Sequence, residues 1–250
     1  MWTARLIHES MCHEQSRFVT LTYSEEALPK SGSLEYRDFQ LFMKRVRKRG
    51  FRSESAKPIR FFVAGEYGSK RKRPHYHALM FNFRPEDEVE LARGKFRSKL
   101  LEERWECGQV DVGGVTPASC AYVAGYAMKK WYGRGRAMYE DVVDESTGEV
   151  TARRPEFCQM SKGIGAAFLA RYAGDVFPDD RVVISGKQYQ VPRYYWNWYQ
   201  EHFPVEAEDL AQRRWEKRLA MREENTPERL EVRELYQHGK QDFHDSRSDL

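Results

Sequence analysis

The pattern of apolar and polar positions predicts strands and helices in alternation along the chain. Residues 17–23 and 59–67 are rich in β-branched and aromatic side chains, which is typical of strands. Between them, four apolar residues recur at the spacing of one helix face and predict an amphipathic helix over residues 35–49. These four residues are Phe39, Phe42, Met43 and Val46.

The same reasoning predicts the remaining elements of the chain. We expect helices over residues 2–15, 85–105, 117–131 and 166–173, a short strand over 109–115, and a hairpin over 181–191. From Glu206 the sequence is highly charged with a helical pattern, and Thr226-Pro227 is typical of a new helix start. This last part is therefore predicted to be a peripheral pair of helices.

Residues 73–83 contain two histidines in an otherwise apolar strand pattern. Side chains alternate along a strand, so His75 and His77 are predicted to share one face, about 6–7 Å apart. A hairpin with residues 59–67 would bring Glu66 close to both histidines. Two imidazoles and a carboxylate can bind a divalent metal ion. The alternative interpretation is a half-exposed strand with two structural histidines and an unrelated surface glutamate.

The predicted helix over residues 117–131 carries two tyrosines one turn apart. Tyr122 and Tyr126 stand at positions i and i+4, which places their Cβ atoms about 5–6 Å apart on one face. Lys129 and Lys130 extend this face with positive charge. An aromatic stripe packed into the core is the alternative explanation.

Charge changes the picture through its distribution and not through its total. The 250 residues carry a net charge of +4, but basic residues gather in blocks at 44–49 and 70–73. Local basicity of this kind favours an anionic partner, with solvated helix and loop faces as the alternative. The candidate nucleic-acid contacts are Lys44, Arg45, Lys48, Lys70, Arg71, Lys72, Arg73 and Lys130.

The cysteines and the apolar runs exclude several classes of protein. Four cysteines are scattered without a CxxC pair, which argues against a disulfide framework and against a cysteine zinc site. No apolar run reaches 18 residues and no signal peptide is evident. We therefore expect a soluble, cytoplasmic protein without a membrane partner.

These candidate residues suit attack of a phenol on a phosphodiester. A tyrosine with a free pKa of about 10 is a poor nucleophile at neutral pH, so the phosphate must be polarised, which a divalent ion can do. A lysine near the phenol can favour the phenolate or hold the phosphate. The product would be a covalent phosphotyrosine. A second tyrosine one turn away could attack a new junction while the first holds the DNA end.

Three segments resemble, in order and spacing, the three motifs of HUH endonucleases. They are Phe18-Val19-Thr20-Leu21-Thr22-Tyr23, His75-Tyr76-His77, and the helix with Tyr122, Tyr126 and Lys129. More narrowly, Gly65-Glu66-Tyr67-Gly68, Arg73-Pro74-His75-Tyr76-His77, Tyr122-Val-Ala-Gly-Tyr126 and Pro155-Glu156-Phe157 are similar to the replication initiators of microviruses, the gokushovirus kind of single-stranded DNA phage.

The resemblance implies a rolling-circle initiator that nicks and rejoins one DNA strand. It implies an α+β fold with an antiparallel sheet flanked by helices, as an endonuclease domain over residues 1–200 with a charged helical extension over 201–250. It also implies Mg²⁺ or Mn²⁺ held by His75, His77 and Glu66, with Tyr122 and Tyr126 as nucleophiles and Lys129 as the motif lysine.

The implied partner is single-stranded DNA at a replication origin, in the cytoplasm of a bacterial host. A host helicase or polymerase is a further candidate partner for the C-terminal helices. Two other functions stay open: a non-catalytic module that binds single-stranded nucleic acid, and a metallonuclease that uses water as its nucleophile.

Overall fold

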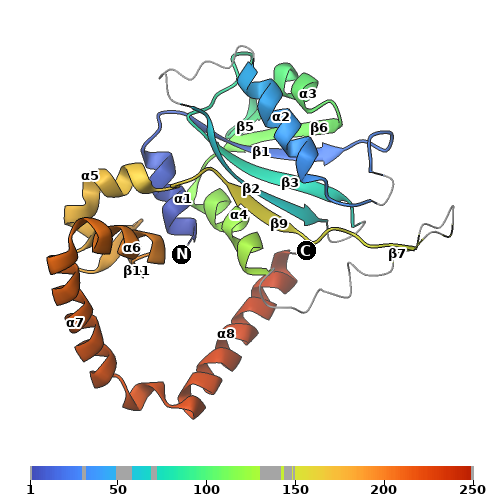
Figure 1. Ribbon diagram of the computed structural model, residues 1–250. Helices are drawn as coiled ribbons and strands as arrows, with labels where there is room; N and C mark the ends of the chain where they lie inside the picture. Colours follow the sequence, from blue (N-terminus) through green and yellow to red (C-terminus); the bar gives the residue numbers. More distant parts are fainter. Residues whose placement is uncertain are drawn as a thin grey trace. The chain divides into compact units, whose positions relative to one another are not determined.

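The structure is a computed structural model that describes residues 2–29, 32–48, 58–68, 72–129, 142–143, 148 and 150–248. The chain divides into two units, Met1–Pro192 and Arg193–Leu250, and each is described by itself. The first unit is an antiparallel sheet with helices on both faces, and the second consists of helices (Figure 1). Among the described residues, none of the helices combines the length and the apolar character needed to cross a membrane.

Seven strands form the main sheet, in the order β4-β5-β6-β1-β3-β2-β9, and every neighbouring pair is antiparallel. The strands are β1 (Ser16–Tyr23), β2 (Arg60–Tyr67), β3 (Pro74–Phe81), β4 (Val89–Ala92), β5 (Lys95–Arg97), β6 (Gly108–Gly114) and β9 (Phe157–Met160). Two short pairs lie outside it, β7 (Val142–Val143) with β8 (Val150–Thr151), and β10 (Arg181–Ile184) with β11 (Lys187–Gln190). The predicted α+β class with an antiparallel sheet flanked by helices is confirmed.

The helices of the first unit are α1 (Trp2–Met11), α2 (Tyr36–Lys48), α3 (Lys99–Trp105), α4 (Pro117–Lys129) and α5 (Ala166–Val176). The second unit contains α6 (Arg193–His202), α7 (Pro204–Ala220), a short 3₁₀ turn η2 (Glu223–Asn225) and α8 (Pro227–Ser248). The amphipathic helix predicted over residues 35–49 and the helix start at Pro227 are both confirmed, within a residue or two at the ends.

The long helix predicted over residues 85–105 is wrong. This segment forms the β4–β5 hairpin followed by the short helix α3. Gly94 turns the hairpin with a φ of +75°, a conformation that favours glycine. The Ser98 hydroxyl then accepts a hydrogen bond from the Leu101 amide at 3.1 Å and starts α3. A glycine turn and an N-cap thus interrupt this charged segment, so a helix forms only in its last part.

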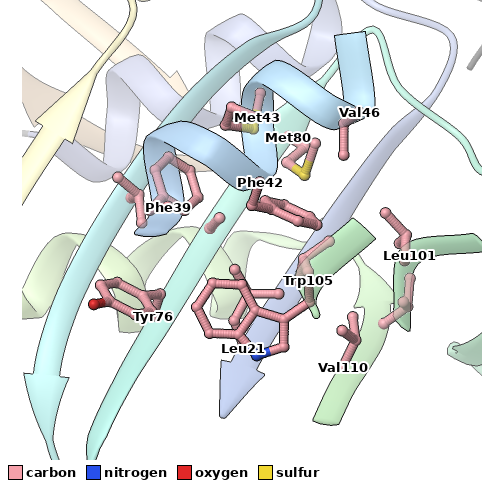
Figure 2. Packing of buried hydrophobic residues seen from close by; sticks show 14 of the residues in the cluster. Leu21, Phe39, Phe42, Met43, Val46, Tyr76, Met80, Leu101, Trp105 and Val110 are labelled. Atoms are coloured by element: carbon pink, nitrogen blue, oxygen red, sulfur yellow. The ribbon is translucent and has the colours of Figure 1, made fainter. Parts of the chain in front are cut away.

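One face of the sheet packs on α2 and α3 (Figure 2). The four apolar residues of α2 are all buried there, together with Tyr76 and Trp105. The Trp105 ring lies 5.2–6.1 Å from the rings of Tyr23, Tyr76 and Phe42. Its indole Nε1–H donates to the Thr22 carbonyl at 3.0 Å. Trp105 therefore fixes α3 to the centre of this core.

Trp105→Ala is expected to lower the free energy of unfolding by about 3–5 kcal/mol, because it leaves a large cavity and an unpaired carbonyl. Urea denaturation measures the change. Trp215→Ala is the matched control, since Trp215 on α7 is 54% exposed, and its expected effect is within about 0.5 kcal/mol. Equal losses in the two variants would contradict the packing described.

The other face of the sheet packs on α1 and α4. Its core contains Leu6 and Ile7 of α1, Cys120 and Val123 of α4, and alternate residues of the strands beneath them. Because side chains alternate along β3, Tyr76 points to the α2 face, whereas His75 and His77 point to the α4 face. The two histidines and the two tyrosines therefore lie on the same side of the sheet.

Candidate active site

His77 occupies the centre of the candidate site. It lies on the middle strand β3, opposite Thr20 of β1 and Ala64 of β2. Its Nδ1 is 3.1 Å from the Thr20 hydroxyl, and its Nε2 is 2.7 Å from Glu66 Oε1. The imidazole is thus held at both ring nitrogens by side chains of the two neighbouring strands, and 8% of the residue is exposed.

His75 lies two residues earlier on the same face, opposite Glu66 in the strand register. The two imidazole rings are nearly parallel, with centroids 6.5 Å apart. His75 Nδ1 is 2.7 Å from the Arg73 carbonyl oxygen. A carbonyl can only accept, so Nδ1 carries the proton and Nε2 keeps its lone pair. Burial lowers the pKa of His75 below its ordinary value, which favours the neutral imidazole.

Gly68 at the end of β2 makes room for the His75 ring. A Cβ atom at this position would lie 3.2 Å from His75 Cε1, which is closer than an ordinary contact. The Gly68 amide also donates to the Arg73 carbonyl at 2.9 Å, the same oxygen that binds His75. The loop between β2 and β3 therefore helps to orient this imidazole.

Helix α4 places its two tyrosines directly over His77. The Tyr122 hydroxyl is 3.5 Å from His77 Nε2, and the Tyr126 ring stacks on the imidazole with centroids 5.6 Å apart. The two tyrosine rings meet edge to face at 5.0 Å. A pair at positions i and i+4 was expected from the sequence, and the structure brings this pair to the predicted histidines.

The start of α4 fixes the direction of this helix. The Thr116 hydroxyl accepts from the Ser119 amide at 3.1 Å, and the Ser119 hydroxyl accepts from the Thr116 amide at 2.8 Å. This reciprocal pair caps the first turn, in which Pro117 is the first residue of the helix. The buried residues Cys120 and Val123 then anchor α4 on the sheet.

The surroundings of the two phenols raise their pKa values. Burial is the main cause of the raised pKa of Tyr122, and the charge of Glu66 adds to it. Burial is again the main cause of the raised pKa of Tyr126, followed by its hydrogen bond to Tyr122 and by the charge and hydrogen bond of Glu66. Both side chains are therefore neutral phenols at pH 7, and a reaction at either oxygen requires removal of a proton.

Sequence reasoning missed two residues that contact His77. Besides Thr20, the Phe18 ring lies 5.8 Å from the His77 ring and 6.2 Å from the Tyr122 ring. Both residues face the same side of β1, as strand alternation requires. That signal could have selected them, but only with the knowledge that β1 pairs with β3.

The predicted basic residues occupy different places. Lys44, Arg45 and Lys48 lie on α2, which covers the face of the sheet opposite His77. Arg45 forms an ion pair with Glu106 at 2.6 Å. The structure therefore does not bring this block together with the tyrosines.

The other basic residues belong to the β2–β3 loop and to the end of α4. Lys72 is exposed, while Arg73 pairs with Glu25 and donates to the Tyr23 carbonyl at 2.8 Å. Lys129 is the last residue of α4, and its side chain is not among the described ones. Lys70, Arg71 and Lys130 lie outside the described residues.

The three predicted metal ligands differ in how well they fit a cation. Within the described part of the chain, no three His, Cys, Asp or Glu side chains are arranged as a ready metal site. Glu66 Oε1 and His77 Nε2 are 2.7 Å apart, close to the roughly 3.0 Å between two ligands at right angles around Mg²⁺. His75 offers a free Nε2 lone pair but stands one ring spacing away. The donor types fit a divalent cation, and binding would require His75 and Glu66 to move together.

The comparisons with known proteins concern this same region. Residues 16–131, from β1 to just past the end of α4, match a family model of replication-associated proteins of the ORF2 type. Over these residues the chain belongs to the ORF2 family of replication-associated proteins. The family match spans every residue of the site described above. No solved structure gives a significant match to the chain.

Relatives of this ORF2-family chain come from three phages. It is 36% identical to replication-associated protein VP4 of Bdellovibrio phage phiMH2K, over 80% of the chain and 62% of the relative. It is 31% identical to replication-associated protein ORF4 of Chlamydia phage 1, over 75% and 46% respectively, and 32% identical to replication-associated protein ORF2 of Spiroplasma virus 4, over 71% and 56%. The chain thus spans about half to three fifths of these relatives. The resemblance to microvirus replication proteins is confirmed.

Proposed function

We propose that the chain initiates rolling-circle replication by nicking and rejoining single-stranded DNA at an origin through a 5′-phosphotyrosine. The observation that carries the proposal is the placement of two phenols over the His77–Glu66 pair, with the Tyr122 hydroxyl 3.5 Å from His77 Nε2. The family match and the phage relatives, which are replication-associated proteins, support the same role.

The reaction needs few groups besides a phenol and a polarised phosphate. The phenol oxygen of one tyrosine attacks the phosphorus, a new O–P bond forms, and the bond from phosphorus to the 3′ oxygen breaks. The 3′ oxygen leaves as a hydroxyl with the proton that the phenol gives up. The free energy of the phosphodiester is kept in the phosphotyrosine, so a 3′ hydroxyl can later reverse the step.

We assign a divalent cation, Mg²⁺ or Mn²⁺, to His77, Glu66 and the free Nε2 of His75. When bound, such a cation polarises the phosphate and neutralises charge that develops on its oxygens. The residues of the chain supply the orientation: Thr20 and Glu66 fix the His77 ring, and the Arg73 carbonyl fixes the tautomer of His75. Lys129 at the end of α4 is the candidate for contact with the phosphate.

The DNA strand is proposed to cross the α4 face of the sheet, near the β2–β3 loop. Lys72 is exposed in this loop, shortly before the strand that carries the histidines. The basic residues of α2 face away from this path, so they would contact other parts of the DNA. The proposed place of action is the host cell in which phage DNA replicates.

Formation of a covalent adduct tests the proposal. The chain is incubated with Mn²⁺ and 3′-labelled single-stranded oligonucleotides that tile the replicon encoding it, and the products are separated on a denaturing gel. We expect one oligonucleotide to yield a labelled band at the size of protein plus DNA. Excess EDTA is expected to remove this band, and added Mn²⁺ to restore it, because the phenols are neutral and need the polarised phosphate.

The other outcomes identify the competing functions. Cleavage without an adduct would indicate a metallonuclease with water as the nucleophile. Salt-sensitive binding without any cleavage would indicate a non-catalytic binding module. An adduct that forms at full yield in EDTA would contradict the role assigned to the cation.

A further inference from the structure

The two tyrosines of α4 are one helical turn apart, yet their surroundings differ strongly. Tyr122 is 49% exposed, whereas Tyr126 is 9% exposed and belongs to the buried cluster beneath α1 and α4. The Tyr122 ring meets His77 and Phe18 edge-on, with ring planes 80–81° apart. The Tyr126 ring instead lies flat on His77, at an interplanar angle of 7°. A DNA strand that arrives from solvent therefore reaches the Tyr122 oxygen first.

The hydroxyl groups also differ in what they bind. Tyr126 is hydrogen-bonded to the Glu66 carboxylate, which also binds His77 Nε2 at 2.7 Å. An ionised carboxylate can only accept, so the Tyr126 hydroxyl donates its proton to Glu66. Attack by Tyr126 on a phosphate requires the loss of this hydrogen bond. The Tyr122 hydroxyl instead faces the Tyr126 hydroxyl and His77 Nε2, the latter at a long 3.5 Å.

We propose that the two tyrosines have fixed and different roles, with Tyr122 making the first cut and Tyr126 the second. This inference rests on the proposed nicking function. In the first step the Tyr122 oxygen bonds to phosphorus, the bond from phosphorus to the 3′ oxygen breaks, and the released 3′ hydroxyl carries the phenol proton. Tyr126 stays hydrogen-bonded to Glu66 during this step.

The second step uses a further copy of the DNA site after the first tyrosine is occupied. The Tyr126 oxygen bonds to the phosphorus of the new junction, and a second 3′ hydroxyl is released. That hydroxyl attacks the phosphotyrosine at Tyr122, the bond from phosphorus to the Tyr122 oxygen breaks, and this phenol regains a proton. One closed DNA strand is released, while the chain stays joined to DNA through Tyr126.

Single substitutions separate the two roles. The substrate is a 3′-labelled DNA strand with two copies of the oligonucleotide sequence that wild-type protein cleaves, so that circle release needs both cuts. Tyr122→Phe is expected to lower formation of the first adduct by at least about a hundredfold. Tyr126→Phe is expected to keep the first adduct within about threefold of wild type but to lower circle release by at least about tenfold. Tyr172→Phe, at an exposed tyrosine of α5, is the matched control and is expected to behave as wild type.

The outcomes distinguish this inference from the function on which it rests. If wild-type protein forms an adduct but both single variants lose it equally, or both keep it, the division of roles is wrong and the nicking function stands. If wild-type protein forms no adduct on any oligonucleotide, the nicking function itself fails. A thermal melt of Tyr126→Phe, expected to show a cooperative transition as in wild type, excludes loss of folding as the cause of an altered product pattern.

Discussion

His77→Ala is expected to lower the rate of DNA cleavage by about a thousandfold or more while leaving DNA binding nearly unchanged. His77 contacts Glu66, Tyr122, Tyr126 and Thr20, so its removal separates the carboxylate from the phenols. Loss of cation binding and orientation costs several kcal/mol of transition-state stabilisation, and each 1.36 kcal/mol is about a factor of ten. Cleavage rates are measured on denaturing gels, and binding is measured by fluorescence anisotropy with a labelled oligonucleotide.

His238→Ala is the matched control for this variant. His238 lies on α8 and its side chain is 69% exposed, so its removal is expected to change neither cleavage nor binding. Loss of binding and cleavage together in His77→Ala would indicate a purely structural histidine. The same cleavage rate as wild type would exclude His77 from the reaction.

The double variant Tyr122→Phe with Tyr126→Phe is expected to form no covalent adduct at all. Phenylalanine keeps both rings, and therefore the edge-to-face contact at 5.0 Å and the stack on His77, but it removes both nucleophilic oxygens. The expected loss of adduct exceeds about a thousandfold, the scale on which removal of a covalent nucleophile acts. Adduct yield on a denaturing gel is the measurement.

Binding provides the control for the double variant. It is expected to bind the same oligonucleotide with an affinity within about threefold of wild type, because the phosphate contacts that dominate affinity are unchanged. An adduct that persists in the double variant would mean that a different side chain attacks the phosphate.

The candidate site could be predicted from the sequence to the extent that its geometry is local. The hairpin of β2 and β3 is short, and its register places Glu66 directly opposite His75, as expected from the loop between the two strands. The i and i+4 spacing of Tyr122 and Tyr126 guaranteed that both would lie on one face of α4. These relations depend on neighbouring residues and on the periods of strands and helices.

Relations between distant segments could not be derived in this way. The contact of Thr20 with His77 requires the pairing of β1 with β3, and these two residues are 57 positions apart. Likewise, the pattern of α2 identifies its buried face but not which side of the sheet it covers, so the basic residues of α2 were expected to be available to the site. The helix wrongly predicted over residues 85–105 shows that charged β-hairpins imitate helices when their turn glycine is overlooked.

The proposed function depends on attack by an α4 phenol on the phosphate that lies beside His77 and Glu66. The most direct measurement is mass spectrometry of the peptide–nucleotide adduct, after protease and nuclease digestion of the complex trapped with Mn²⁺. The expected result is a nucleotide joined through a 5′ phosphate to the peptide of α4, at Tyr122 in the complex formed by the first cut. A nucleotide attached to a residue outside α4, or a cleaved strand with no attached peptide, would contradict this mechanism.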